Sequence, residues 1–328
     1  MKALVLTGKN EPLVLSEVPD CKAGPGEAVV RVHAAALNHR DVWIQKGQYA
    51  GLKFPVVPGS DGAGVVVEAT PSWIGKEVII NPSLNWGDHT SHQNPGYHIL
   101  GLPEAGTLAE YVKVPLENLI EKPAHLSFEE AAALPVAGVT AYRALMVRAQ
   151  LRQGQKILIT GIGGGVALFA FQFALAAGAK VYVTSGSQEK IEKAMAMGAA
   201  GAANYRDAGW VESLRASAGS FDITIDGAGG DGMNALLDLA TPGGTVVLYG
   251  ATHGNPSSLV ARRIFWKQLN VLGSTMGTAD DFQKMIHFIR DHAIHPVVDS
   301  VFPFEEGENA FRWMDEARQF GKIIVRIA

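Results

Sequence analysis

A glycine-rich turn between an apolar strand and an apolar helix is the feature of this sequence best suited to chemistry. The segment reads ILITGIGGGVALFAFQFA, and its turn consists of Gly161, Ile162, Gly163, Gly164, Gly165 and Val166. Glycines let backbone N–H groups approach a pyrophosphate, and the positive end of the helix dipole favours the same anion. The strict G-x-G-x-x-G spacing is not met, so an ordinary tight turn is the alternative. The strand–turn–helix context favours a dinucleotide site.

The residues after the next strand indicate which dinucleotide would bind. An NAD site places Asp or Glu about 20 residues beyond the glycines, on the ribose 2′-hydroxyl. This sequence has Ser185, Gly186 and Ser187 there, followed by Lys190. Hydroxyls and an ammonium suit a 2′-phosphate, which a carboxylate would repel, so we predict NADPH. Ser187 could also cap the next helix and Lys190 could be a surface charge, and both roles are compatible with binding.

Strands and helices alternate around this turn. The strand at 156–160 is followed by the apolar runs KVYVT, FDITIDG, GTVVLYG and LNVLGST. The segments VALFAFQFALAAGA and QEKIEKAMAMGA are helical in pattern, and they end at Gly178 and Gly198. Such alternation predicts parallel βαβ units in a doubly wound sheet, whose last strand would leave an exposed edge.

The sequence before this region has a different pattern of residue types. Residues 1–123 carry short β-rich runs separated by Gly and Pro, which are KALVLT, EAVVRVHAAAL, GAGVVVEA, KEVIINP and GTLAEYVKVP. Their close spacing predicts a β-rich, barrel-like domain. A helix is expected over 125–149, with Ser127 as N-cap and Glu130 as its capping-box partner. The tail, expected to form helix, turn, helix and strand, would return to the first domain. We therefore expect one domain from 1–123 and 277–328, and a second from 124–276.

Composition excludes several classes of function. With 328 residues, 47% hydrophobic and 18% charged, the chain suits two packed domains. A net charge of −4 does not indicate a basic surface for nucleic-acid binding. The start lacks a secretory pattern, and the most apolar run, 166–179, is too short to span a bilayer. The lone Cys21 excludes an internal disulfide and a four-cysteine zinc lobe. We expect a cytoplasmic protein with a small-molecule substrate and neither nucleic-acid nor membrane partners.

An ordered set of short motifs resembles the medium-chain dehydrogenase/reductase superfamily, in particular its quinone oxidoreductase and zinc-type alcohol-dehydrogenase-like branches. The motifs are LNHRDVWIQKGQY, PGSDGAGVV, GTLAEYV, AALPVAGVTAY, GIGGGVA, ANYRD, FDITIDGAGG, PGGTVVLYG and GKIIV. The resemblance implies an α/β protein with a GroES-like catalytic domain, a Rossmann domain and a cofactor cleft between them. It also implies cofactor-binding roles, which fall on His39 at the pyrophosphate, Tyr205 at the 2′-phosphate, Thr140 at the nicotinamide ribose, and Gly250, Ala251 and Thr252 at the nicotinamide end. His39 could equally be a surface histidine at a helix start.

Departures from the zinc-dependent relatives point to a site without metal. Those relatives have Cys, His and a third ligand where this sequence has Asn38, Ser60 and Val136, and a proton-relaying hydroxyl where it has Arg40. No thiolate or imidazole remains among these positions, so they cannot form a Cys/His zinc site.

Without a Lewis acid, the acceptor must already be electron-poor, as quinones and α,β-unsaturated carbonyl compounds are. The family pattern places Asn38 and Tyr49 beside the nicotinamide, where they would donate hydrogen bonds to the developing oxyanion. Asn38 could instead cap a helix, and Tyr49 could pack in its loop. Asp41 and Asp61 are interpreted as hydrogen-bonded structural acids rather than general bases.

Two alternatives stay open. His89, His92 and His98 lie in one polar loop and could bind a metal for an alcohol or aldehyde dehydrogenase, although the loop, with Trp86 and Tyr97, could instead shape the substrate mouth. A crystallin-like or sensory NADPH-binding protein without turnover is the other class. We expect a homodimer or homotetramer, formed by pairing of the exposed sheet edge.

Overall fold

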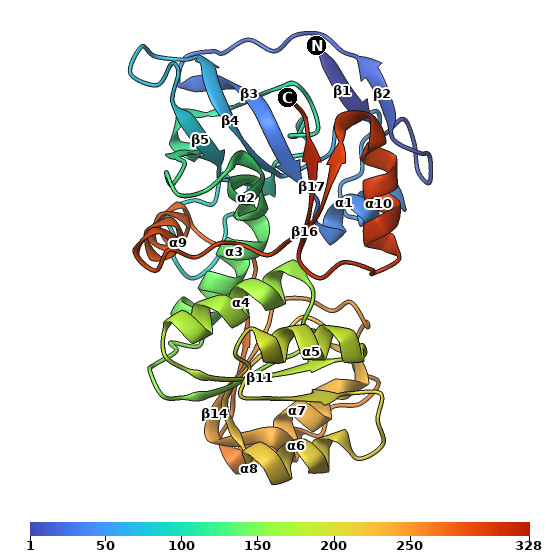
Figure 1. The fold of residues 1–328 in the computed structure, drawn as a ribbon, viewed down its shortest axis with the longest axis vertical. Helices are drawn as coiled ribbons and strands as arrows, with labels where there is room; N and C mark the ends of the chain where they lie inside the picture. Colours follow the sequence, from blue (N-terminus) through green and yellow to red (C-terminus); the bar gives the residue numbers. More distant parts are fainter. The chain divides into compact units, whose positions relative to one another are not determined.

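The chain folds as two units that are joined twice (Figure 1). The computed structural model describes residues 1–328. Unit 1 contains Met1–Val139 and Gly277–Ala328, and unit 2 contains Thr140–Met276. The C-terminal segment therefore returns to the first unit. No helix is both long and apolar enough to cross a bilayer.

Unit 1 is built on a seven-stranded sheet. Its strands are β3 (Glu27–Ala36), β4 (Asp61–Glu68), β5 (Glu77–Ile80), β8 (Tyr111–Pro115), β9 (Leu119–Glu121), β16 (Val298–Pro303) and β17 (Lys322–Arg326). Their order is β16, β17, β3, β4, β5 and β9, with β8 paired to β3 outside this path. Only β16 and β17 pair in parallel. Two short antiparallel pairs complete the unit, namely β1 (Lys2–Val5) with β2 (Val14–Glu17) and β6 (Ser83–Leu84) with β7 (His98–Ile99).

Within the motif PGSDGAGVV, the contact between β3 and β4 requires Gly64. A Cβ atom on Gly64 would lie 2.0 Å from the carbonyl oxygen of Arg31 on β3. Only glycine allows the two strands this approach. The alternate residues Ala28, Val30 and Val32 of β3 point into the core of the unit.

Short helices complete unit 1. They are α1 (His39–Gln45), α2 (Phe128–Ala133), α9 (Ala279–Asp291) and α10 (Gly307–Asp315), with 3₁₀ turns at Leu116–Asn118 and Phe304–Glu306. At α2 the predicted capping box is confirmed, because Ser127 Oγ accepts from the Glu130 N–H at 3.1 Å and Glu130 Oε2 from the Ser127 N–H at 2.9 Å. Helix α2 packs on β3, β4 and β17, so the first boundary between the units lies after Val139 instead of after residue 123.

The helix expected over 125–149 is divided into three parts. After α2 come α3 (Pro135–Tyr142) and a π-helix at Arg143–Arg148. Pro135 has no N–H to continue the hydrogen-bond ladder of α2, and it suits the first turn of the next helix.

Unit 2 is a doubly wound parallel sheet, as predicted. The strands are β10 (Lys156–Ile159), β11 (Lys180–Ser185), β12 (Gly201–Asn204), β13 (Phe221–Asp226), β14 (Ala240–Leu248) and β15 (Asn270–Gly273). Their order is β12, β11, β10, β13, β14 and β15, and every pair is parallel. The chain reverses direction across the sheet between β10 and β13, which is where dinucleotides bind in such folds. Strand β15 forms an edge, as expected.

Helices cover both faces of this sheet. They are α4 (Gly165–Ala176), α5 (Gln188–Ala196), α6 (Trp210–Ala218), α7 (Met233–Leu239) and α8 (Ala261–Lys267), with a 3₁₀ turn at Gly230–Gly232. Helices α4 and α5 lie on one face, and α6, α7 and α8 lie on the other (Figure 1). Strand β12 was not predicted, because its residues GAAN carry no β-branched or aromatic side chain. Strand β16 lies where the sequence predicts a turn.

Candidate functional site

The glycine-rich turn of unit 2 joins the end of β10 to the start of α4. Gly161 has φ +65° and Gly163 has φ +120°, a left-handed region that other residues rarely adopt. Helix α4 begins with Gly164 as N-cap, and no side chain caps its first N–H groups. These N–H groups and the helix dipole form a surface that suits a pyrophosphate.

The turn is tied to the segment after β11. The Ile162 N–H donates to the Thr184 carbonyl at 2.8 Å, and Ser185 Oγ donates to the Ile162 carbonyl at 3.4 Å. Ser187 Oγ accepts from the Lys190 N–H at 3.4 Å, so Ser187 is the N-cap of α5. The Lys190 side chain extends over the turn, since a Cβ atom on Gly163 would lie 2.7 Å from Lys190 Cδ. Lys190 is therefore close to the surface proposed for phosphate.

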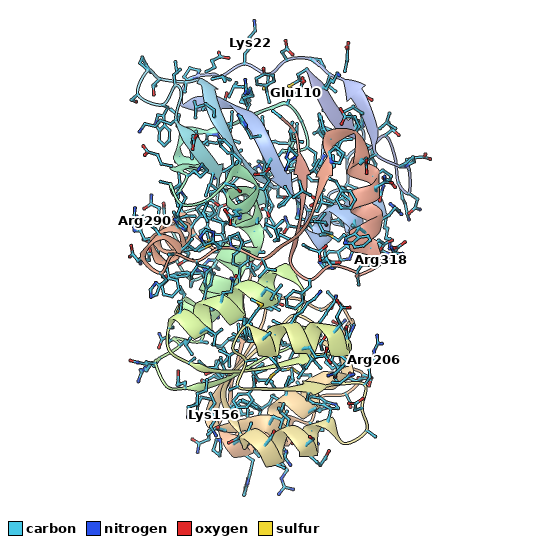
Figure 2. The ribbon with its side chains drawn as sticks, in the orientation of Figure 1. Lys22, Glu110, Lys156, Arg206, Arg290 and Arg318 are labelled. Carbon is cyan, nitrogen blue, oxygen red and sulfur yellow. The ribbon has the colours of Figure 1, made fainter.

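A third segment, after β12, brings a phenol and a second cation to the same place. A Cβ atom on Gly186 would lie 2.7 Å from Tyr205 Oη and 2.8 Å from Arg206 Nε. Tyr205 is 39% exposed, and Arg206 lies at the periphery of unit 2 (Figure 2). Ser187, Lys190, Tyr205 and Arg206 thus come from the carboxyl ends of neighbouring strands, and they fit a phosphate-bearing adenosine.

The loop after β14 lies against the loop after β13. Thr252 donates to the Gly227 carbonyl from its N–H at 3.2 Å and from Oγ1 at 3.3 Å. A Cβ atom on Gly250 would lie 3.0 Å from the same oxygen. The expected residues 250–252 therefore lie at the carboxyl edge of the sheet. Two other residues expected at the cofactor are not part of these loops. Thr140 is buried, and its Oγ1 lies 3.7 Å from Met276 Sδ. His39 is exposed on α1 of unit 1.

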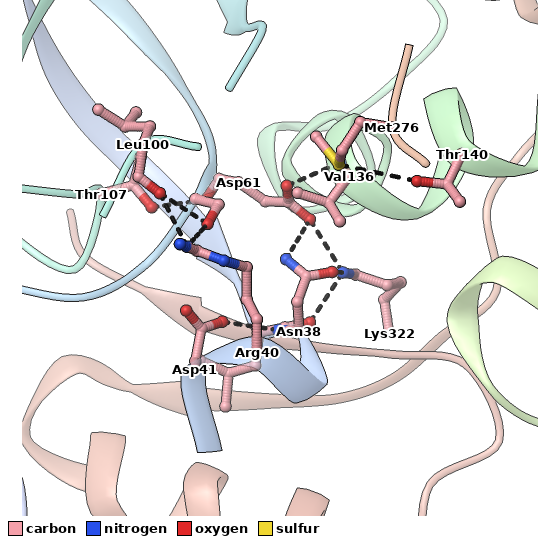
Figure 3. Close-up of polar contacts among 12 residues, drawn as sticks. Asn38, Arg40, Asp41, Asp61, Leu100, Thr107, Val136, Thr140, Met276 and Lys322 are labelled. Atoms are coloured by element: carbon pink, nitrogen blue, oxygen red, sulfur yellow. Dashed lines mark hydrogen bonds and ion pairs between the residues drawn. The ribbon is translucent and has the colours of Figure 1, made fainter. Parts of the chain in front are cut away.

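In unit 1, a buried carboxylate organises the residues singled out by sequence (Figure 3). Asp61 Oδ2 accepts from Asn38 Nδ2 and from Lys322 Nζ, each at 2.9 Å, and Asp61 Oδ1 accepts from the Val136 N–H at 2.8 Å. Lys322 Nζ also donates to Asn38 Oδ1 at 2.7 Å and to the Leu37 carbonyl at 2.8 Å. The side chains of Asp61 and Lys322 are 0% and 4% exposed. All three N–H donors of the Lys322 ammonium are used. We call Asn38, Asp61 and Lys322 the Asp61 cluster.

Arg40, on α1, is a second buried cation, 6% exposed. Its Nη1 donates to Ser60 Oγ and, at 2.9 Å, to the Leu100 carbonyl (Figure 3). The guanidinium carbon lies 5.0 Å from the centroid of the Tyr49 ring, and Nε lies 3.5 Å from Tyr49 Oη. Tyr49 is therefore held against Arg40, and it does not merely pack in its own loop.

The carboxyl groups of Asp61 and Asp41 differ in how completely they are hydrogen-bonded. Asp61 is fully hydrogen-bonded, which fits the structural role expected for it. Asp41 Oδ2 accepts from the Asn38 N–H at 2.8 Å, but Asp41 Oδ1 is buried without a partner. Burial raises the pKa of the Asp41 carboxyl, and the charge of Arg40 opposes this shift.

The histidine loop does not assemble a metal site. His89 and His92 stack on each other with ring centroids 4.7 Å apart, whereas His98 Nε2 lies 3.3 Å from Glu104 Oε1. Across the chain, no group of three or more His, Cys, Asp or Glu side chains could hold a metal ion. In the same loop, burial raises the pKa of Tyr97 to about 12, and the Tyr97 ring meets Trp86 edge-on at 5.3 Å. Tyr97 is thus a neutral phenol at ordinary pH.

Comparison with known proteins places both units in one class of enzymes. Models of the alcohol dehydrogenase GroES-like domain and of the zinc-binding dehydrogenase domain match residues 24–124 and 165–291. A zinc-type alcohol dehydrogenase-like protein of Schizosaccharomyces pombe is 36% identical, over 95% of this chain and 93% of that protein. An acryloyl-coenzyme A reductase of Sulfurisphaera tokodaii is 29% identical, over 99% and 100%. A solved structure of an NAD-dependent alcohol dehydrogenase is 36% identical, with TM-score 0.94 and full coverage of both chains.

These matches define a two-domain oxidoreductase built from a GroES-like domain and a Rossmann domain. The chain belongs to the medium-chain dehydrogenase/reductase superfamily, as its motifs predicted. The predicted fold class is likewise confirmed.

The name of the second family model implies zinc, but the residues at the ligand positions do not fit it. The amide of Asn38 is bonded to Lys322 and Asp61, the hydroxyl of Ser60 is bonded to Arg40 and to the Leu100 carbonyl, and Val136 offers no side-chain donor. Zinc needs thiolate, imidazole or carboxylate ligands, and two cationic side chains already surround these positions.

Three cations of the site were not predicted from sequence. They are Lys322, Arg206, which follows Tyr205 directly, and Arg40, for which the sequence indicates only the loss of a hydroxyl. Arg206 could have been found from its position in the ANYRD motif. The partners of Arg40 and Lys322 are too distant in sequence to be recognised.

The Asp61–Lys322 ion pair can be tested by a double-mutant cycle. Lys322→Met leaves a buried carboxylate without its ammonium, so we expect the free energy of unfolding to fall by about 3–5 kcal/mol. Asp61→Asn combined with Lys322→Met should recover much of this loss, and urea denaturation measures both. Lys46→Met, which removes an exposed partner of Asp315, is the control and should cost less than about 1 kcal/mol. Additive losses in the double variant would contradict the coupling.

Proposed function

We propose that this protein transfers hydride from NADPH to a quinone or an α,β-unsaturated carbonyl compound without a catalytic zinc. The main support is the surroundings of the Asp61 cluster, where two of the ligand positions hold Asn38 and Ser60, whose side chains are bonded to the cations Lys322 and Arg40. With no Lewis acid to polarise a carbonyl, the acceptor must already be electron-poor. Quinones and enones meet this condition, and simple ketones do not.

The cofactor assignment rests on unit 2. The turn at 161–166 would hold the pyrophosphate, and Ser185, Gly186, Ser187, Lys190 and Tyr205 would surround the 2′-phosphate. Arg206 adds a second cation to this set. At the end of β11, where an NAD site has its carboxylate, this chain has Ser185, Gly186 and Ser187, although one similar structure is described as NAD-dependent. The charge of these side chains therefore favours NADPH.

The bound nicotinamide supplies a hydride from its C4 atom. We assign Thr140, Gly250, Ala251 and Thr252 to the surroundings of the nicotinamide. We assign His39 to the pyrophosphate. Tyr49 and Asn38 would donate to the oxygen on which charge develops, and water would supply the proton. One hydrogen of the Asn38 amide already binds Asp61, so Tyr49 is the less committed donor.

The relatives leave two substrate classes to compare. The acryloyl-coenzyme A reductase is named for an unsaturated thioester, which supports the enone assignment. The alcohol dehydrogenase names support the alternative, oxidation of an alcohol or aldehyde. A non-catalytic NADPH-binding protein is the third option, and a cytoplasmic location stays a prediction.

We also propose a homodimer or homotetramer formed through the edge of the unit 2 sheet. Strand β15 is unpaired on one side. Beside it in sequence, Leu259 and Val260 are exposed, and Phe265 and Trp266 are 65% and 73% exposed. Exposed apolar side chains next to an open strand favour pairing with a second copy of the chain.

A substrate panel tests the proposed activity. The purified protein should oxidise NADPH with quinones and enones, and prior dialysis against a chelator should leave the rate unchanged. Absorbance of the reduced nicotinamide measures turnover. Alcohol oxidation that requires added zinc would overturn the proposal in favour of the metal-dependent alternative. NADPH binding without any turnover would favour the non-catalytic one.

Cofactor choice is tested at Lys190. Lys190→Asp should weaken NADPH binding roughly ten- to hundredfold, because it replaces a charge-assisted contact with repulsion, and should change NADH binding little. Lys193→Asp makes the same charge change one turn further along α5 and is the control. Fluorescence titration gives both dissociation constants. An equal loss for the two cofactors would refute the 2′-phosphate assignment.

The assembly is tested at Trp266. Trp266→Glu places a charge on the apolar surface beside β15 and should shift the protein to a smaller species in sedimentation velocity. Met195→Glu alters another exposed apolar residue, on α5, and should leave the assembly intact. A monomeric wild-type protein would rule out the interface.

A further inference from the structure

The two buried cations of unit 1 differ in how completely they are satisfied. Lys322 has three donors and three acceptors within 2.9 Å, one of them the carboxylate of Asp61. Arg40 is buried to a similar degree, but it forms no ion pair with any carboxylate. A buried cation without a counter-ion is costly unless the site is built to receive negative charge.

The guanidinium of Arg40 is also incompletely hydrogen-bonded. Its Nη1 group uses both hydrogens, on Ser60 Oγ and the Leu100 carbonyl. The remaining contacts are long: Nε to Tyr49 Oη and Nη2 to the Ile99 carbonyl are each 3.5 Å. A guanidinium carries five N–H donors in a fixed fork, so Nε and Nη2 keep donor capacity for a further acceptor.

None of the nearby acids forms a hydrogen bond or an ion pair with Arg40. Asp41 is the nearest acid in sequence, and its Oδ1 is buried without a partner instead of pairing with Arg40. Asp61 is bonded to Lys322. The side chains that contact the guanidinium carry hydroxyl groups, namely Ser60 and Tyr49. Arg40 therefore has no carboxylate as a hydrogen-bond partner.

We propose that Arg40, through its Nε and Nη2 groups, whose present contacts are each 3.5 Å long, and together with the Tyr49 hydroxyl, is the oxyanion-binding group of this enzyme. The proposal rests on the hydride transfer proposed above and names the group that stabilises its charge. When hydride adds to the β-carbon of an enone, the carbon–carbon π bond is broken and its electron pair shifts. The carbonyl oxygen then carries the negative charge of an enolate. Water protonates the α-carbon and leaves hydroxide, the nicotinamide is oxidised and the enone is reduced. In a quinone, the oxygen becomes a phenolate.

This assignment gives each cation its own part. Lys322 holds Asp61 and Asn38 in position and has no donor left for a ligand. The Nη1 group of Arg40 is held by Ser60 and the Leu100 carbonyl, and the Tyr49 ring lies against the guanidinium, so these contacts fix the plane of the fork. A fixed donor set in a water-poor site stabilises a developing oxyanion more than a mobile one does, because no reorganisation is needed.

The test uses p-nitrophenol, a phenol whose ionised form absorbs in the visible range. In the wild-type protein, the bound phenol should ionise at least one pH unit lower than in solution, which is about a tenfold preference for the phenolate. Arg40→Met should abolish this shift. Arg290→Met removes an exposed arginine on α9 and should keep it (Figure 2). No shift in the wild-type protein, or the same shift in Arg40→Met, would overturn the proposal.

A second variant covers loss of folding. If circular dichroism shows Arg40→Met to be unfolded, Arg40→Lys keeps the charge but lacks the fork, and it should reduce the phenolate preference at least threefold. An unchanged preference would count against Arg40. The readout needs no turnover, so the two proposals can fail separately. If the protein stabilises phenolate through Arg40 but reduces neither quinones nor enones, the oxyanion site is supported and the proposed function is wrong.

Discussion

The site in unit 1 depends on one buried carboxylate. Asp61 receives a hydrogen bond from the backbone at the start of α3 and two from side chains of Asn38 and Lys322. A carboxylate removed from water is tolerated only when its lone pairs are satisfied and its charge is opposed. The polypeptide must therefore bring together β4, β17, the entry to α1 and the entry to α3. The same requirement fixes Val136 and Asn38, two of the positions where zinc relatives bind metal.

Much of the fold was readable from sequence because its determinants are local. The turn at 161–166, the capping box at Ser127 and the alternation of strands and helices are each contained within a few residues. Strand β12 was missed because tertiary pairing, not the propensity of GAAN, makes it a strand. The break at Pro135 had a local signal, whereas the place where the units divide depends on which sheet α2 packs against.

The site could be predicted less completely because the residues in contact are far apart in the sequence. Lys322 and Asp61 are 261 positions apart, and no periodicity links them. Tyr49 and Asn38 were selected from a family pattern. The structure adds that Asn38 is bonded to both members of the ion pair, and that Tyr49 lies on a guanidinium. The loss of zinc ligands was visible in the sequence, but the charges that stand in their place were not.

Those charges follow from the acids that remain. Asp41 and Asp61 lie beside positions where zinc relatives have thiolate and imidazole ligands, and each is buried among other partners here. Lys322 neutralises Asp61 directly. Burial raises the pKa of Asp41, and the charge of Arg40 opposes this shift. Arg40 forms no ion pair with a carboxylate, so its charge is offset less directly than that of Lys322.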